Sequence, residues 1–207
     1  MRIEKIAGEP DRAGRYMTTL SDGTTLRLYP QVIADLGLYA GFELDEEAYQ
    51  KLIETAGSAS AKMRAVRIVS ASAVSSRDLE QRLVRKGEDP AHAHAAVEWM
   101  SELNLVDDGE TARQIVRKGI AKGYGKARVK QMLYEKQIPK ELWAEALADF
   151  PEQSEAIMAF LRNRLGEAPD DKTKKRAIDA LLRRGHRWEE IRRCLSELDE
   201  EMEAYDE

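Results

Sequence analysis

From about residue 60 onward, apolar residues recur at i, i+3 and i+4, the spacing of helices that bury one face. Three segments share one pattern: two apolar residues four positions apart, then a basic residue, then a break. The three sets are Leu79/Leu83/Lys86, Val129/Leu133/Lys136 and Ala177/Leu181/Arg184. A helix is expected before each segment and another after it. The sequence therefore predicts a three-helix unit of about 48 residues, repeated three times.

The flanking helices are predicted from the same spacing. The helices that precede the three segments are expected at residues 62–72, 110–122 and 152–165. The helices that follow are expected to start near Pro90, Pro139 and Arg187. Their apolar faces are Ala93/Ala96/Val97/Met100, Leu142/Trp143/Ala146/Leu147 and Ile191/Cys194/Leu195/Leu198, and Trp99, Trp143 and Trp188 are expected as core anchors. Because one unit alone buries its apolar face poorly, we expect the units to form an elongated curved array.

The first 56 residues have a different pattern. Strand-like residues at 16–20 and 24–28 flank the turn signal Ser21-Asp22-Gly23, which predicts a β-hairpin, joined by an earlier strand at 2–7. Pro30 suits the first turn of a short helix that ends before Gly37. Asp45 is a good N-cap for a second helix that runs to Thr55.

The small residues at 57–60 are expected to form a flexible joint between this region and the repeats. The predicted fold class is therefore mainly α, with a small N-terminal β-hairpin and helix region before three tandem three-helix repeats. The expected domains are 1–56 for the N-terminal region, then 60–106, 107–150 and 151–207 for the three repeats.

The order of charged residues along the chain says more about a binding partner than the overall composition does. The 207 residues carry a formal net charge of −5, which by itself argues against an anionic partner. The charges are segregated, however. Residues 113–136 hold eight basic residues and one acid, and residues 172–193 hold nine basic residues and three acids. Positive runs at corresponding places in two repeats favour nucleic acid or an acidic protein as partner, whereas solvated helix faces are the alternative.

The acidic C-terminal tail, residues 197–207, holds seven acids and no base. One interpretation is a solubilising end of the chain. The other is that the tail competes with partners for the basic faces.

Residues for catalysis or metal binding are not assembled in this sequence. His92, His94 and His186 do not have zinc-ligand spacing, and the single cysteine, Cys194, lies on an apolar helix face where a buried thiol is expected. No phosphate-binding loop motif occurs. We therefore expect a binding protein, not an enzyme, with no cofactor and no metal. A lone cysteine, no apolar signal region and no apolar run of ~20 residues favour a cytoplasmic location without membrane contact.

Several short motifs, taken in order, resemble one bacterial family. Ser75, Asp78, Leu79, Leu83, Lys86 and Gly87 match the pattern S-x-x-E-L-x-x-x-L-x-x-K-G of the RecX regulatory proteins. Leu105-Val106-Asp107-Asp108 with Ala112 resembles the family's link into its second repeat. Gly123-Tyr124-Gly125, Val129, Leu133, Lys136 and Ile138 resemble its G-x-x-x-I-x-x-x-L-x-x-K-G-I stretch. The sequence departs from these patterns at residues 72–74, where arginines are common, at Thr111, which replaces an aromatic residue, and at Gln137, which replaces a glycine.

The resemblance implies three tandem three-helix repeats that bind the RecA recombinase and its filament on single-stranded DNA. Such proteins modulate the filament in DNA repair and the SOS response, usually by inhibiting extension, ATP turnover, strand exchange and the LexA coprotease function, and some also contact DNA. On this basis we expect a monomer whose electrostatic contacts come from nine basic residues: Arg85, Lys86, Arg117, Lys118, Lys126, Arg128, Lys130, Arg183 and Arg184. The alternatives are a general DNA-binding protein built from tandem helical modules, binding single-stranded or duplex DNA, and an adaptor scaffold for another protein.

Overall fold

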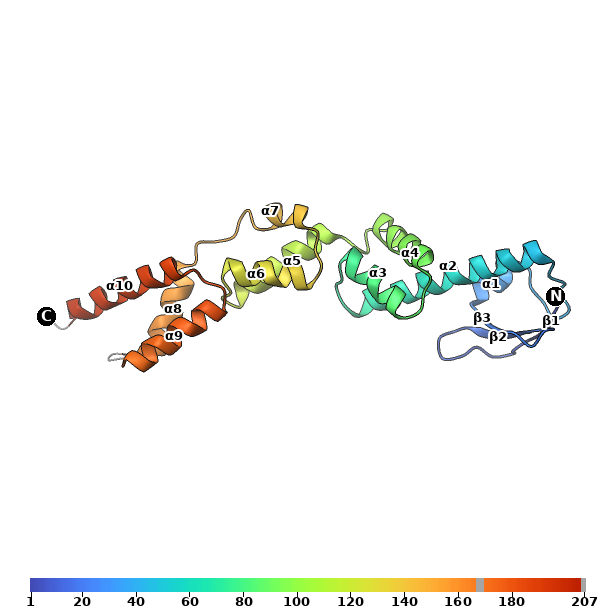
Figure 1. The fold of residues 1–207 in the computed structure, drawn as a ribbon, viewed down its shortest axis with the longest axis horizontal. Coiled ribbons are helices and arrows are strands. Elements are labelled where there is room, and N and C mark those ends of the chain that lie inside the picture. The colour runs from blue at the N-terminus through green and yellow to red at the C-terminus, as the bar shows by residue number, and fades with distance from the viewer. Residues whose placement is uncertain (167–169, 206–207) are drawn as a thin grey trace. The chain divides into compact units, whose positions relative to one another are not determined.

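A computed structural model describes residues 1–166 and 170–205, and their side chains as far as residue 200 (Figure 1). The described chain is mostly helical with a small N-terminal sheet, so the predicted fold class is confirmed. The strands are β1 (Ile3–Ile6), β2 (Tyr16–Leu20) and β3 (Thr25–Leu28). The helices are α1 (Pro30–Asp35), α2 (Glu46–Ala71), α3 (Ser76–Arg85), α4 (Pro90–Glu102), α5 (Asp108–Ala121), α6 (Lys126–Glu135), the 3₁₀ turn η1 (Lys140–Leu142), α7 (Trp143–Ala146), α8 (Ser154–Leu165), α9 (Asp171–Arg183) and α10 (Trp188–Tyr205).

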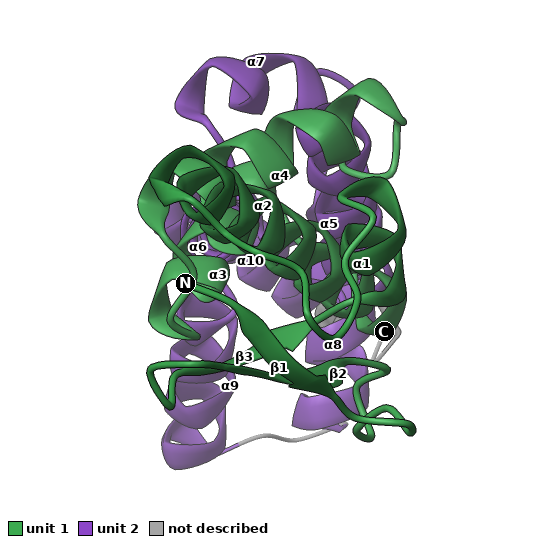
Figure 2. Cartoon of the chain, turned by 90° about the vertical axis from the view of Figure 1, so that its right-hand side faces the viewer, with its two compact units in different colours: residues 1–106 green, residues 107–207 purple. Residues whose placement is uncertain are grey.

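The chain divides into two compact units, residues 1–106 and residues 107–207 (Figure 2). The first unit contains the sheet and α1 to α4, and the second contains α5 to α10. The four-part domain division and the curved array of repeats stay predictions.

The N-terminal sheet is antiparallel, with strand order β1-β2-β3. The predicted hairpin is confirmed, with Thr18 opposite Leu26 and Tyr16 opposite Leu28. The turn forms because Asp22 accepts a hydrogen bond from the Thr24 N–H at 2.9 Å. One face of the sheet packs against α1 and the N-terminal half of α2. The buried residues of this core include Ile3, Leu20, Leu28, Val32 and Leu52.

Helix α2 is continuous through residues 57–60, so the predicted flexible joint is wrong. The small residues there serve close packing instead. Gly57 lies directly against the His92 ring of α4, and a Cβ at this position would overlap that ring. Ala59 packs against the N-terminal core, while Ala61 and Ala65 are fully buried in the core of the first repeat. One helix therefore belongs to both cores.

A second set of contacts joins the N-terminal region to the first repeat. Arg67, in the C-terminal half of α2, donates to the carbonyl oxygen of Ala13 at 2.7 Å and to the Tyr29 hydroxyl at 3.3 Å. Its guanidinium also lies over the Tyr29 ring. These contacts and the continuous helix hold the sheet against the first repeat.

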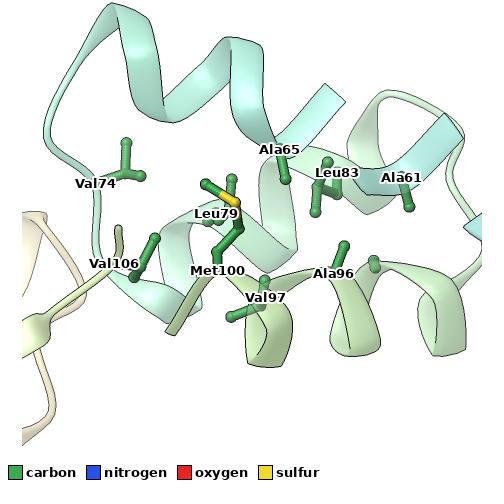
Figure 3. Close-up of a cluster of buried hydrophobic side chains, with 10 residues drawn as sticks. Ala61, Ala65, Val74, Leu79, Leu83, Ala96, Val97, Met100 and Val106 are labelled. Carbon is green, nitrogen blue, oxygen red and sulfur yellow. The ribbon is translucent and has the colours of Figure 1, made fainter. Parts of the chain in front are cut away.

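The first repeat is the C-terminal half of α2 with α3 and α4. Figure 3 shows the side chains of Leu79, Leu83 and Met100 pointing toward one another between these helices. Ser75 caps α3 by accepting from the Asp78 N–H at 3.1 Å. Asp89 caps α4 by accepting from the Ala91 N–H at 2.8 Å.

The second and third repeats follow the same plan, with α5, α6 and α7 in one and α8, α9 and α10 in the other. Val129 and Leu133 are buried in the second, and Ala177 and Leu181 in the third. Asp107 caps α5 by accepting from the Glu110 N–H at 2.9 Å.

The last helix of the second repeat is shorter than predicted. Only the turn η1 and the four-residue α7 form where a full helix was expected. The buried side chain of Leu147 ends the apolar face. Pro151 follows soon after, and a proline disfavours helical backbone at the residue before it.

The tryptophans differ from the prediction in one case. Trp99 and Trp143 are half-buried and pack against the cores of their repeats. Trp188 is 47% exposed, so it is not a core anchor. It is the first residue of α10, and the neighbouring His186 occupies the buried position at that end of the third repeat.

The break after each middle helix is the same turn in all three repeats. The residue that follows the helix cap has positive φ: 89° at Gly87, 55° at Gln137 and 85° at Gly185. Its N–H donates to the carbonyl of Val84, Tyr134 or Leu182, at 2.9 Å in each case. The next N–H donates to Leu83, Leu133 or Leu181, at 3.1, 3.0 and 3.2 Å. This pair of bonds is the Schellman motif, which ends helices with a left-handed residue.

Candidate partner-binding surface

The second and third repeats contact each other through backbone atoms at the start of α6. The N–H of Gly125 donates to the carbonyl of Arg184 at 2.9 Å, and the N–H of Ala127 donates to the carbonyl of Gly185 at 3.3 Å. Gly125 is the N-cap of α6 and has no capping side chain. The Gly185 carbonyl takes over this role, because it accepts from an N–H that a capping side chain commonly satisfies.

Two glycines make this approach possible. A Cβ on Gly125 would overlap the Gly185 carbonyl, and a Cβ on Gly185 would overlap the backbone nitrogen of Arg128. The equivalent N-cap positions of α3 and α9 are Ser75 and Asp170, whose side chains cap their helices. The glycine at 125 therefore marks the point where the two repeats pack together.

His186 closes the same junction. Its ring is buried, and Nε2 lies 3.1 Å from the carbonyl oxygen of Gly123, which can only accept. Nδ1 has no hydrogen-bond partner within the described residues. Burial lowers the pKa of His186 below its ordinary value. The ring is therefore neutral, with its proton on Nε2.

A cleft of about 460 Å³ opens beside this junction. Lys126 and Lys130 of α6 line it from the second repeat, and Arg187 lines it from the third. None of these three side chains has an ion-pair partner in the part of the chain that the structure describes. Phe150 and Pro151 add an apolar wall. The cleft thus collects three available cations from two repeats.

The two acids in the cleft have hydrogen-bond partners within the third repeat. Glu152 pairs with Arg193 at 2.8 Å, and hydrogen bonds from Arg193 and the Ser154 hydroxyl lower the pKa of this carboxyl. Glu190 lies 3.4 Å from the backbone N–H of Arg187 and accepts from it. The cleft therefore attracts anionic groups.

Two predicted contact residues beside the cleft have structural partners. Arg128 pairs with Glu135 at 3.0 Å, and its backbone packs against Gly185. The Arg184 guanidinium lies 4.7 Å from the centre of the Phe160 ring, and the backbone carbonyl of Arg184 accepts from the Gly125 N–H. Both residues shape the junction. Arg183 is exposed at the end of α9.

The other predicted contact residues lie outside the cleft. Arg117 on α5 pairs with Glu110 at 2.7 Å, and hydrogen bonds from Arg117 and Arg113 lower the pKa of Glu110 to about 2. Lys118 is exposed on the same helix. Arg85 and Lys86 are exposed at the end of α3 in the other unit, and the Lys86 carbonyl accepts from Arg64 at 3.0 Å. Of the nine predicted residues, the structure therefore places Lys126 and Lys130 in the cleft.

Sequence reasoning missed Arg187 as a member of this cluster. The residue lies in the second basic run, but its place opposite Lys126 depends on the contact between Gly185 and Ala127. Its only local signal is its position directly after the Gly185-His186 break. A contact between residues about 60 positions apart is not encoded in helical periodicity.

The acidic tail lies partly outside the described residues. Within the described part, Asp199 pairs with Lys174 of α9 at 3.0 Å and Glu197 lies 3.8 Å from Arg193. These acids are thus engaged with basic residues of their own repeat.

Cys194 is fully buried in the third-repeat core, as predicted, and burial raises the pKa of its thiol. Among residues 1–166 and 170–200, no group of histidine, cysteine and carboxylate side chains is arranged to hold a metal ion. Over the same residues, no helix has the length and apolar character that a bilayer crossing requires.

Several known proteins with similar sequences are regulatory proteins RecX of bacteria. A regulatory protein RecX of Halorhodospira halophila is 30% identical over 153 residues, which cover 72% of this chain and 95% of that protein. A regulatory protein RecX of Clostridium acetobutylicum is 24% identical over 205 residues and is covered to 95%, as is this chain. A family model described as "RecX, second three-helix domain" matches residues 107–147 of this chain.

Solved structures show the same fold. A crystal structure of a regulatory protein RecX aligns over 94% of this chain and 98% of its own, with a TM-score of 0.66 and 22% identity. The RecX structure from Lactobacillus salivarius aligns over 69% of this chain and 97% of its own, with a TM-score of 0.61 and 19% identity. The repeat plan, the similarity in sequence and the coverage of whole relatives lead to one conclusion: the chain belongs to the RecX family of regulatory proteins.

Proposed function

We propose that this protein binds the RecA recombinase and its filament on single-stranded DNA, and inhibits its ATPase, strand-exchange and coprotease activities in DNA repair and the SOS response. It acts in the cytoplasm by binding, without catalysis of its own. The family membership supports this function. The structural observation that carries it is the cleft between the second and third repeats, where Lys126, Lys130 and Arg187 have no ion-pair partner among the described residues.

Unpaired cations suit a nucleoprotein partner better than paired ones do. A filament presents acidic protein groups and phosphates together, and both attract positive charge. Arg117 and Arg128 would first have to leave Glu110 and Glu135. Lys126, Lys130 and Arg187 can bind without that cost. The electrostatic contact is therefore assigned first to these three residues, and then to Lys118 and Arg183.

The test is recombinase ATP turnover on single-stranded DNA, titrated with this protein. The wild type is expected to inhibit. The variant Lys126→Glu/Lys130→Glu/Arg187→Glu should need at least tenfold more protein for the same inhibition, because three attractions become repulsions. The matched control is Arg2→Glu/Lys5→Glu/Arg12→Glu, which makes the same charge change at exposed sites of the N-terminal region. It should inhibit like the wild type.

Two results would contradict the proposal. If saturating wild-type protein left ATP turnover unchanged, the proposed function would be refuted. If the cleft variant and the control lost inhibition equally, the assignment of the contact to the cleft would be refuted. A gel shift with DNA alone separates this function from general DNA binding, because a DNA-binding protein would shift the DNA without recombinase and with a steep dependence on salt.

A further inference from the structure

Each repeat exposes one large apolar side chain at the same place on its middle helix. Val84 on α3 is 40% exposed, Tyr134 on α6 is 64% exposed and Leu182 on α9 is 43% exposed. Each follows a leucine of the repeat core, and the three leucines are at most 1% exposed. The three positions are thus one position of the repeat, found three times.

The turn itself does not require an apolar side chain at this position. The carbonyls of Val84, Tyr134 and Leu182 accept the N–H of Gly87, Gln137 and Gly185. Any residue supplies that carbonyl. A single exposed apolar residue needs no explanation, but three at equivalent positions indicate a surface that contacts something.

An available cation stands near each of these residues in the sequence, and in one repeat it also shares the same helix face. Lys130 is one helical turn before Tyr134 and shares its face of α6, whereas Lys86 is two residues after Val84 and Arg183 directly follows Leu182, spacings at which side chains do not face each other. All three are exposed. Within the described residues, none of the three has an ion-pair partner. The feature that all three repeats share is therefore the exposed apolar group, and in the second repeat Lys130 places a positive charge beside it.

The first repeat also has a hollow at this position. Val84 lines a depression of about 420 Å³ together with Arg77, Glu80, Gln81 and Arg85. Glu80 is engaged by His94, whose Nδ1 lies 3.3 Å from the carboxylate. The two arginines leave this depression positively charged, and it can receive an apolar side chain that has acidic neighbours.

We propose that Val84, Tyr134 and Leu182 are three equivalent anchor points, each of which contacts an apolar patch with an acidic border on successive subunits of a protein polymer. A contact that recurs three times along one chain fits a partner whose surface also recurs. Linked weak contacts add effective concentration, so three anchors can hold a polymer firmly while one anchor holds a single subunit weakly. This inference rests on the proposed function, since the polymer is the recombinase filament.

The test measures binding to recombinase filaments on single-stranded DNA. The variants are Val84→Ser, Tyr134→Ser and Leu182→Ser, singly and together. The side chains are exposed and the turn uses only backbone carbonyls, so the variants should keep the wild-type circular dichroism and thermal unfolding. We expect each single change to weaken binding about threefold to tenfold, and the triple change about a hundredfold or more, because the contacts are linked.

The matched control is Met17→Ser/Tyr39→Ser/Leu103→Ser, which removes side chains with 53%, 62% and 49% exposure outside the repeated position. It should bind like the wild type. Salt separates the anchors from the cleft. The triple anchor variant should keep the wild-type salt dependence of binding, whereas Lys126→Glu/Lys130→Glu/Arg187→Glu should reduce it.

The outcomes distinguish the two proposals. If wild-type protein binds filaments and the triple anchor variant binds as tightly as its control, the anchor points are overturned and the proposed function stands. Wild-type protein that does not bind filaments would overturn both.

Discussion

The N–H of Gly125 donates to the carbonyl oxygen of Arg184 at 2.9 Å. This hydrogen bond joins the N-cap residue of α6 to the turn after α9. The two residues are 59 positions apart in the sequence. With the bond from Ala127 to Gly185, this contact brings the basic residues of two repeats to one cleft. The position of the candidate site therefore depends on a glycine and not on the basic residues alone.

Gly125→Ser should destabilise the protein, although serine is a better helix N-cap than most residues. Its Cβ would overlap the Gly185 carbonyl, so the third repeat would have to move away from α6. We expect a loss of about 2 kcal/mol in the free energy of unfolding, measured by urea denaturation, since overpacking costs of this size are typical.

The control for this change is Gly8→Ser, because a Cβ on Gly8 meets no atom within 4 Å and Gly8 has no positive φ. It should change stability by less than about 0.5 kcal/mol. A Gly125→Ser protein as stable as this control would show that the backbone contact between the repeats is dispensable.

Gln137→Gly should stabilise the protein. Gln137 has φ of 55°, the left-handed region that Gly87 and Gly185 occupy in the equivalent turns. A side chain in this region costs about 1 kcal/mol, and glycine removes that cost at the expense of a more flexible unfolded chain. We expect a net gain of about 0.5 kcal/mol in the free energy of unfolding, measured by urea denaturation.

The reciprocal change is Gly87→Gln, which places a side chain in the same turn of the first repeat. A Cβ there meets no atom within 4 Å, so the effect comes from the backbone alone. It should lower stability by about 1 kcal/mol. Changes of the same sign in both variants would contradict a common turn geometry.

The sequence predicted correctly those features that depend on residues close to one another in the chain. The N-caps Asp45 and Asp107, the turn at Asp22 and the buried pairs such as Leu79 and Leu83 follow from rules that act within one or two helical turns. The fold class and the repeats could therefore be predicted from the sequence, and so could the basic runs that contain Lys126 and Lys130.

The errors came from contacts between distant residues. Small residues at 57–60 are typical of a joint when read alone, but here they let α2 pack against His92 and the N-terminal core. Arg128 and Arg184 carry the same charge as Lys130, yet their partners Glu135 and Phe160 make them structural. Arg187 was missed because its position opposite α6 is a property of the packed repeats.

Gly57→Ala tests the continuous helix α2 directly. Alanine has the higher helix propensity, by about 1 kcal/mol, and would stabilise an exposed helix. At this position the added Cβ overlaps the His92 ring, so we expect a loss of about 1–3 kcal/mol in the free energy of urea unfolding.

The matched variant is Gly57→Ala with His92→Ala, which removes the ring that the Cβ would meet. Compared with His92→Ala alone, the double variant should be more stable, because only the propensity gain remains. If Gly57→Ala stabilised the wild type as well, the close packing of α2 against α4 would be refuted.

The stability of the protein should fall as the pH drops below about 7, because of His186. Its pKa is lowered in the folded chain by burial, so the unfolded chain binds the proton more readily. The neutral ring stabilises the junction fully above the ordinary histidine pKa of about 6.5. This stabilisation is lost as the pH falls through the lower folded value, with a slope of at most about 1.4 kcal/mol per pH unit for one proton.

The geometry explains why the proton is excluded. Burial opposes the charged ring most strongly, and a protonated Nδ1 would be a buried donor without an acceptor among the described residues. The hydrogen bond to Gly123 and the charge of Glu190 favour the proton but are outweighed, and Arg184 opposes it least of all. The measurement is urea unfolding from pH 7.5 to 5.5 for the wild type and for His186→Gln, which does not titrate and keeps a donor for the Gly123 carbonyl. The wild type should lose more stability over this range than His186→Gln. Parallel pH profiles would show that protonation of His186 does not weaken the junction between the two repeats.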